Sequence, residues 1–194
     1  MGELKALLPW AGKTLLEHQV DALASAGLSP IIVVLGHQAD RLLPLVAPKP
    51  GVQTVRNPDY RQGKTTSLKA GLRTLQGTWA DTASPEEDAL LVLNVDQPRS
   101  QATILRVLDL YVEGSQTTLI TIPTYEGKGG HPVVLSTSLM SELVEVSEES
   151  LGLLKVVRRH EGETQRVDLG TAEVLLDLNT TEDYQKALET FGSP

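Results

Sequence analysis

Residues 89–100 read ALLVLNVDQPRS, and this stretch decides the fold expected for the chain. Its first part is almost entirely apolar, which is typical of a strand buried on both faces of a sheet. Asp96 follows that strand directly, and Pro98 stiffens the exit toward the next helix. Because open α/β sheets bind ligands beside the carboxyl ends of their strands, the stretch predicts such a sheet with a polar site at its edge.

Working outward, the chain alternates between strand-like and helix-like segments. Further strands are expected at 31–36, 53–55, 117–122, 132–136 and 174–178. A helix that carries Leu68, Leu72 and Leu75 should end at Gly77, and the most loop-like stretch is 77–88. Another helix is expected to start at the capping box of Thr14 and Glu17, and a last one to run from the cap of Thr180 and Asp183 to residue 191. Further helices are expected at 101–113, 138–147 and 151–159. This alternation predicts an α/β fold with a mostly parallel sheet.

Composition excludes several classes of protein. The chain has 194 residues and no Cys, so disulfides, thiolate metal sites and a Cys nucleophile are ruled out. No apolar run is long enough to span a membrane and no signal peptide is visible, which predicts a cytoplasmic protein without a membrane partner. A net charge of -8 argues against nucleic acid as a partner.

Two common nucleotide-binding motifs are absent from the sequence. GKT occurs at 12–14 and 63–65, but a P-loop also needs a glycine where this chain has Leu7 and Pro58. The chain also lacks the GxGxxG pattern. A phosphate-binding role therefore has to come from other residues.

Polar residues at two strand ends are candidates for a metal site. Asp96 ends one strand, and Asp177 with Asn179 ends another, where alternate side chains share a face. Few carboxylates together with substrate phosphates are the ligands that Mg²⁺ prefers. Each of these residues could instead serve only a turn or a helix cap, and this alternative to metal binding stays open.

Basic residues gather between Tyr60 and Ala80, where there is no acid: Arg61, Lys64, Lys69 and Arg73. The same stretch holds Thr65, Thr66 and Ser67 at a helix start, where free N–H groups and hydroxyls can hold a phosphate or a base edge. The alternative is a solvated helix face with ordinary caps. Lys5 could contact phosphate, and His131 could be a local hydrogen-bonding residue.

Five motifs, in order along the chain, resemble those of the MobA-like nucleotidyltransferases. The first, MGELKALLPWAGKTLLEHQV, resembles the end of their signature LAAGxSxRMGxxKxLLPxxGxxLLE. The others are NPDYRQGKTTSLKAGL, VDQPRS, GGHPVVLS and LLDLNTTEDY. GELK followed by LLP is most similar to the molybdenum cofactor cytidylyltransferase branch, because the guanylyltransferase branch has GGxDK there.

The resemblance implies a role for each matching residue. Gly2 and Lys5 would contact the triphosphate, and Lys5 and Asp96 would be catalytic. The nucleotide pocket would be formed by Gly63, Thr66 and Ser67. Mg²⁺ would be held by Asp96, Asn179 and Asp177, and the acceptor by His131. The implied fold is a three-layer, Rossmann-like nucleotidyltransferase domain spanning residues 1–194.

Some positions depart from the family pattern. Thr181 stands where the family usually has a Pro, and Lys64 stands where a Met is common. Asn179 stands where the cytidylyl branch usually has an Asp. Because Asn occurs at this position in the guanylyl branch, the choice between CTP and GTP stays open. The family's first strand and LAAGxSxR loop have no counterpart, so we expect Met1 to be the internal Met of that signature. Without that strand, a gap or a substitute strand should lie beside 31–36 and 89–95, and CTP should bind poorly.

The predicted function is Mg²⁺-dependent transfer of CMP from CTP to a phosphorylated acceptor, molybdopterin, with release of pyrophosphate. Such a reaction needs positioning and charge neutralisation more than a protein nucleophile. One alternative is a sugar- or polyol-phosphate acceptor. Another is a non-catalytic, chaperone-like protein that binds molybdopterin for a partner molybdenum oxidoreductase.

Overall fold

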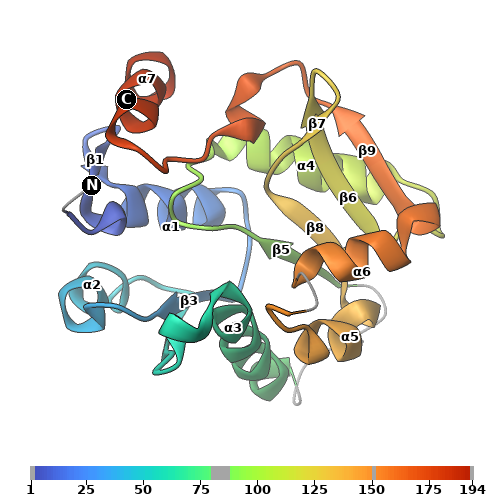
Figure 1. The fold of residues 1–194 in the computed structure, drawn as a ribbon, viewed down its shortest axis with the longest axis horizontal. Coiled ribbons are helices and arrows are strands. Elements are labelled where there is room, and N and C mark those ends of the chain that lie inside the picture. The colour runs from blue at the N-terminus through green and yellow to red at the C-terminus, as the bar shows by residue number, and fades with distance from the viewer. Residues whose placement is uncertain (1–2, 80–87, 150–151, 193–194) are drawn as a thin grey trace.

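The structure is a computed structural model that describes residues 3–79, 88–149 and 152–192. Helices and strands alternate along these ranges, which confirms the α/β class (Figure 1). None of the helices in them combines the length and the apolar composition needed to cross a bilayer. Gly2 and most of the loop-like stretch 77–88 lie outside the described residues.

A pair of parallel strands forms the first part of the fold, as a two-stranded sheet of its own. Strand β3 (Ile31–Leu35) pairs with β4 (Val52–Arg56). Side chains alternate across β3: Val33 and Leu35 pack with α1 (Leu15–Ser25) and α2 (Ala39–Val46), whereas Ile32 and Val34 face α3 (Lys64–Trp79). This part therefore has helices on both faces.

The second part is a five-stranded sheet of mixed orientation. Its order is β5-β8-β6-β7, and β9 pairs with β6. The strands are β5 (Ala89–Val92), β6 (Ile120–Tyr125), β7 (Lys128–Gly129), β8 (Val133–Ser136) and β9 (Thr164–Asp168). Only the β6–β9 pair is parallel, because β8 runs against both of its neighbours and β7 folds back on β6. The sheet is thus more mixed than the expected mostly parallel one.

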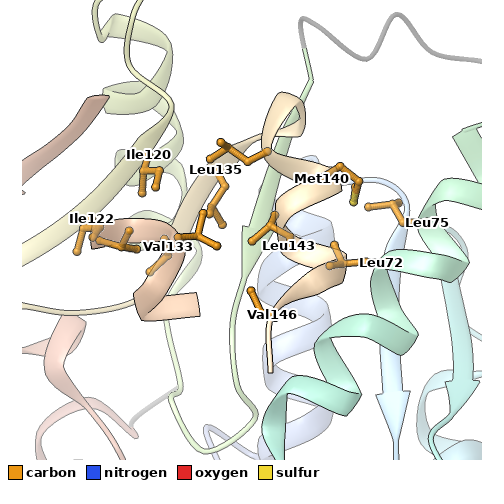
Figure 2. Packing of buried hydrophobic residues seen from close by; sticks show 12 residues of the cluster. Leu72, Leu75, Ile120, Ile122, Val133, Leu135, Met140, Leu143 and Val146 are labelled. Carbon is orange, nitrogen blue, oxygen red and sulfur yellow. The ribbon is translucent and has the colours of Figure 1, made fainter. Parts of the chain in front are cut away.

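The main core lies between this sheet and helices from both halves of the chain. Figure 2 shows Leu72 and Leu75 of α3 facing Met140 and Leu143 of α5 (Met140–Glu145). Residues from β6 and β8 continue the cluster, together with Val156 and Val157 of α6 (Leu153–Arg159). Helix α4 (Gln101–Glu113) packs against β6 and β8. Each fully buried aliphatic side chain contributes about 2 kcal/mol, so this cluster fixes the sheet relative to α3.

A groove separates the two-stranded sheet from the five-stranded one. Among the described residues, β3 pairs only with β4 and β5 only with β8, so the facing edges of β3 and β5 are unpaired. A cavity of about 530 Å³ lies there, lined by all of β3, by residues 89–96, and by side chains of α1 and α3. The expected gap beside 31–36 and 89–95 is therefore present.

Local capping signals are confirmed. Thr14 and Glu17 form a capping box at the start of α1, and Gly27 has a positive φ just beyond its end. Thr180 and Asp183 form a second capping box at the start of α7 (Thr181–Phe191). Short elements complete the chain: the 3-10 turns Lys5–Leu7, Tyr60–Gln62, Thr137–Leu139 and Glu161–Glu163, and the strands β1 (Pro9–Trp10) and β2 (Lys13–Thr14).

The expected bounds of one helix and the position of one strand were also wrong. Helix α3 continues past Gly77 to Trp79, because one glycine costs a helix only about 1 kcal/mol and Thr78 bonds back to the Thr74 carbonyl. The stretch 174–178 is not a strand; residues Ala172–Leu175 form a 3-10 turn instead. The strand in that region is β9, which sequence pattern missed because it is largely polar.

Candidate active site

Three residues predicted for catalysis and metal binding meet beyond the carboxyl end of β5. The strand ends at Val92, so Asp96 lies in the loop that follows and not directly after the strand as expected. The Lys5 ammonium donates to Asp96 Oδ2 at 2.9 Å and to Asn179 Oδ1 at 3.1 Å. The two oxygens therefore contact the same ammonium group, which places Asp96 and Asn179 close together. The side chain of Asp96 is 14% exposed and that of Lys5 30%, so the pair sits in the wall of the site rather than on the open surface.

Backbone contacts bring these remote segments together. The N–H of Leu178 donates to the Asp96 carbonyl at 2.9 Å, which places Asn179 beside the strand end. The Gln19 side chain of α1 donates to the carbonyls of Asn94 and Gln97. The loop that carries Asp96 is therefore held from both sides.

Asp177 occupies a different position from Asn179. Segment 176–179 is not a strand, so the two side chains do not share a strand face as expected. Asp177 is exposed, and its carboxylate acts electrostatically on Arg99 and His131. Asn179 is thus the better placed of the two as a neighbour of Asp96.

The predicted nucleotide residues lie at the start of α3. Gly63 precedes the helix with φ +119°, a conformation that favours glycine. The buried side chain of Asn57 donates to Thr66 Oγ1 at 2.9 Å and to Ser67 Oγ at 3.0 Å. Ser67 and Lys64 line the same groove as Asp96, so the helix start and the strand end belong to one cavity.

A carboxylate already lies at this helix start. Glu148 Oε1 accepts from the N–H of Thr65 at 2.7 Å, and a Cβ added at Gly63 would collide with the Glu148 side chain. An N–H group at a helix N-terminus attracts negative charge. The helix start is therefore arranged to hold an anionic oxygen, and Glu148 now supplies it.

His131 lies in a turn that contacts Arg99 and the segment before Asn179. Its backbone N–H donates to the Val174 carbonyl at 2.9 Å, and its ring Nδ1 is buried with no hydrogen-bond partner among the described residues. Burial lowers the pKa of His131 to about 4, and the positive charge of Arg99 adds to the effect. The ring is therefore neutral at physiological pH.

The oxygen pair of Asp96 and Asn179 fits a hard divalent cation. Both are the oxygen donors that such ions take, and the Lys5 ammonium shows that a positive charge is accommodated between them. No group of three or more His, Asp or Glu residues suited to a metal occurs in the described ranges. A metal here would need ligands from water or substrate, as Mg²⁺ commonly does.

Sequence reasoning missed three residues of the site. Asn57 lies inside the NPDYRQGK motif but received no role, and Arg99 directly follows the DQP motif. Glu148 has no local signal, because its partner Thr65 is 83 positions away in the sequence. Only the fold reveals that contact.

The comparisons with known proteins agree with this geometry. Residues 1–164 match the MobA-like NTP transferase domain. The chain is 27% identical over 98% of its length to the molybdenum cofactor cytidylyltransferase of Escherichia coli K12, covering 90% of that protein. It is 26% identical over 95% of its length to the nicotine blue oxidoreductase of Paenarthrobacter nicotinovorans, covering 87% of it.

Solved structures show the same fold. A Mycobacterium tuberculosis H37Rv protein, determined as a complex with manganese, superimposes with a TM-score of 0.71 at 26% identity, over 97% of this chain and 93% of that one. The domain match covers most of the chain, and nucleotidyl transfer is the activity of the matched family. The chain therefore belongs to the MobA-like NTP transferase family and is a nucleotidyltransferase.

Proposed function

We propose that this protein transfers CMP from CTP to a phosphorylated acceptor, molybdopterin, and releases pyrophosphate. Three findings support the choice: the family match, the cytidylyltransferase relative, and the loop sequence GELK followed by LLP. The observation that carries the proposal is the convergence of Lys5, Asp96 and Asn179 beyond the carboxyl end of β5. Residues 1–194 would act as a single nucleotidyltransferase domain.

A divalent cation, Mg²⁺, would be held by Asp96 and Asn179, with Asp177 nearby. The manganese complex of a structural neighbour supports a divalent ion. When bound, the ion would neutralise phosphate charge and help to orient the triphosphate. Lys5, now paired with Asp96, would then be available to a phosphate oxygen as a point charge.

The reaction would proceed by direct displacement. A terminal phosphate oxygen of the acceptor attacks the α-phosphorus of CTP, and the bond from that phosphorus to the bridging oxygen breaks, so pyrophosphate leaves with the electron pair. The chain's residues bind and orient: Thr66 and Ser67 on the nucleotide side, and neutral His131 on the acceptor side. No side chain forms a covalent intermediate in this scheme.

The groove between β3 and β5 bears on the nucleotide site. The facing edges of β3 and β5 are unpaired among the described residues, and the cavity between them has a largely apolar lining. Unpaired edges of this kind accept a further strand. Asp96, Lys64 and Ser67 line the same cavity, so a nucleotide bound there would contact both sides of the site.

A pyrophosphate-release assay tests the proposed reaction. Each of the four NTPs is supplied with molybdopterin, with a sugar phosphate or with a polyol phosphate, in Mg²⁺ and then in EDTA. We expect release only with CTP, molybdopterin and metal together. Pyrophosphate release with GTP would show that the nucleotide substrate is GTP, and release with another acceptor would show that the acceptor is not molybdopterin. Binding of molybdopterin without release under any condition would favour the chaperone-like alternative.

A further inference from the structure

Arg99 is a fully buried charge next to the candidate site. Its side chain is among the largest in the chain with no solvent exposure. Within the described residues, the guanidinium donates only to backbone carbonyls: Nη1 to Pro98 at 2.7 Å, Nε to His131 at 2.8 Å, and Nη2 to Val174 at 2.7 Å and Leu176 at 3.2 Å. A buried arginine with this many backbone acceptors fixes the position of each of them.

The bonded carbonyls belong to three segments that are far apart in the sequence. Pro98 follows Asp96 in one loop, His131 lies in a turn, and Val174 and Leu176 lead to Asn179. The segments also contact one another, because His131 N–H donates to Val174 and Leu178 N–H donates to Asp96. Arg99 thus sits at the junction of three segments that carry or adjoin the candidate site residues Asp96, His131 and Asn179.

The backbone at this junction is tightly packed. A Cβ added at Gly130 would collide with the Val174 carbonyl, so the turn before His131 presses directly on that segment. Arg99 makes no ion pair within 4.0 Å in the described part of the chain, although Glu173 and Asp177 act on it electrostatically. Burial lowers the pKa of Arg99 to about 10, so the group is charged at neutral pH.

We propose that Arg99 is a positioning residue, which holds the Asp96 loop, the His131 turn and the segment before Asn179 in the arrangement that brings the two metal-binding oxygens together. This inference rests on the proposed function. Lysine cannot replace Arg99, because one ammonium cannot match the planar set of donors that reaches carbonyls in three directions. Residues that orient metal ligands typically change metal affinity by about 10- to 100-fold when they are replaced.

The test compares Arg99→Lys and Arg99→Met with Leu143→Ala, a change in the fully buried core away from the site. Mn²⁺ affinity, kcat, KM for CTP and thermal stability are measured for each. We expect Arg99→Lys to weaken Mn²⁺ binding by about 10-fold and to lower kcat more than it raises KM, with Arg99→Met more severe. Leu143→Ala should lower stability but keep Mn²⁺ affinity. Wild-type Mn²⁺ affinity and kcat in Arg99→Lys would overturn the proposal.

Two further measurements keep the proposal testable. If the Arg99 variants do not fold, Gly130→Ala is tested instead, because it disturbs the same junction with Arg99 intact. We expect Gly130→Ala to weaken Mn²⁺ binding. Unchanged Mn²⁺ affinity in this variant would overturn the inference. If the wild-type protein binds no Mn²⁺ and shows no turnover, the proposed function fails. Hydrogen exchange at the Leu178 amide then decides about Arg99: it should be faster in Arg99→Lys than in Leu143→Ala, and equal rates would overturn the positioning role.

Discussion

The two sides of the site are built in different ways. On the strand side, Lys5, Asp96 and Asn179 come from the beginning, middle and end of the chain and meet through charged contacts. On the helix side, Asn57, Thr66 and Ser67 are close in sequence and meet through neutral hydrogen bonds. The strand side thus depends on the whole fold, and the helix side mainly on the start of α3.

The two sides also differ in what they offer a ligand. The strand side presents two oxygens around a cation, which suits a metal ion and the phosphates bound to it. The helix side presents N–H groups and hydroxyls, and one of its N–H groups is held by Glu148. If the nucleotide spans both, changes on the strand side should affect turnover most, and changes on the helix side should affect binding.

The largest effect is expected from Asp96→Ala. Loss of the carboxylate removes the only anionic ligand in the Asp96–Asn179 pair, so turnover should fall by about 100-fold or more. Stability should change by less than about 1 kcal/mol, because the Lys5–Asp96 pair is partly exposed. Pyrophosphate release and thermal melting measure the two quantities. Asp109→Ala, on the exposed side of α4, is the control, and a fully active Asp96→Ala protein would remove the metal assignment.

A smaller effect is expected on the pH dependence of stability, through His131. Asp96 of the strand side and Lys64 of the helix side both act electrostatically on its ring. Its pKa is about 4 when folded, lowered first by burial and then by Arg99 and Lys64, while Asp177 and Asp96 oppose the shift. The unfolded histidine has a pKa near 6.5, so below that pH the unfolded state takes up a proton that the folded state does not. The free energy of unfolding should therefore fall between about pH 6.5 and 4, by at most about 3 kcal/mol.

Urea unfolding at neutral and acidic pH measures this effect. His131→Gln cannot take up the proton, so its stability should fall less on acidification than that of the wild type. His37→Gln, which changes an exposed histidine, is the control. Equal acid sensitivity of the wild type and His131→Gln would show that the His131 ring is not kept neutral by the fold.

The contrast between the two sides also explains what could be predicted from sequence. The capping boxes of Thr14 and Thr180 were predicted correctly, because both partners of each lie within one turn. The proximity of Asp96 and Asn179 followed from placing both after strands, but the strand at 174–178 was wrong. There, the Val174 and Leu176 carbonyls bond to Arg99 instead of a neighbouring strand, and no local pattern reveals so distant a partner.

On the helix side, Ser67→Ala should weaken CTP binding by about 1 kcal/mol, or about fivefold. In the described residues, the Ser67 hydroxyl makes one hydrogen bond, as the acceptor from Asn57, so it can still donate to a ligand. Calorimetry with CTP measures the change, and Ser141→Ala, on the surface of α5, is the control. Unchanged affinity would place the base outside the start of α3.

The smallest effect, and the one with the opposite sign, is expected from Glu148→Gln. The amide oxygen can still accept from the Thr65 N–H, but the negative charge at the helix start is gone. A phosphate that approaches this N-terminus would no longer be repelled, so CTP should bind about two- to threefold more tightly, within the range of one charge at a helix end. Glu149→Gln, at the neighbouring exposed residue, is the matched control for loss of one negative charge. Calorimetry at low ionic strength gives the best resolution, because salt screens such effects. Weaker binding in Glu148→Gln would mean that the carboxylate supports the nucleotide pocket by holding α3, and that the anionic part of the ligand lies wholly on the strand side.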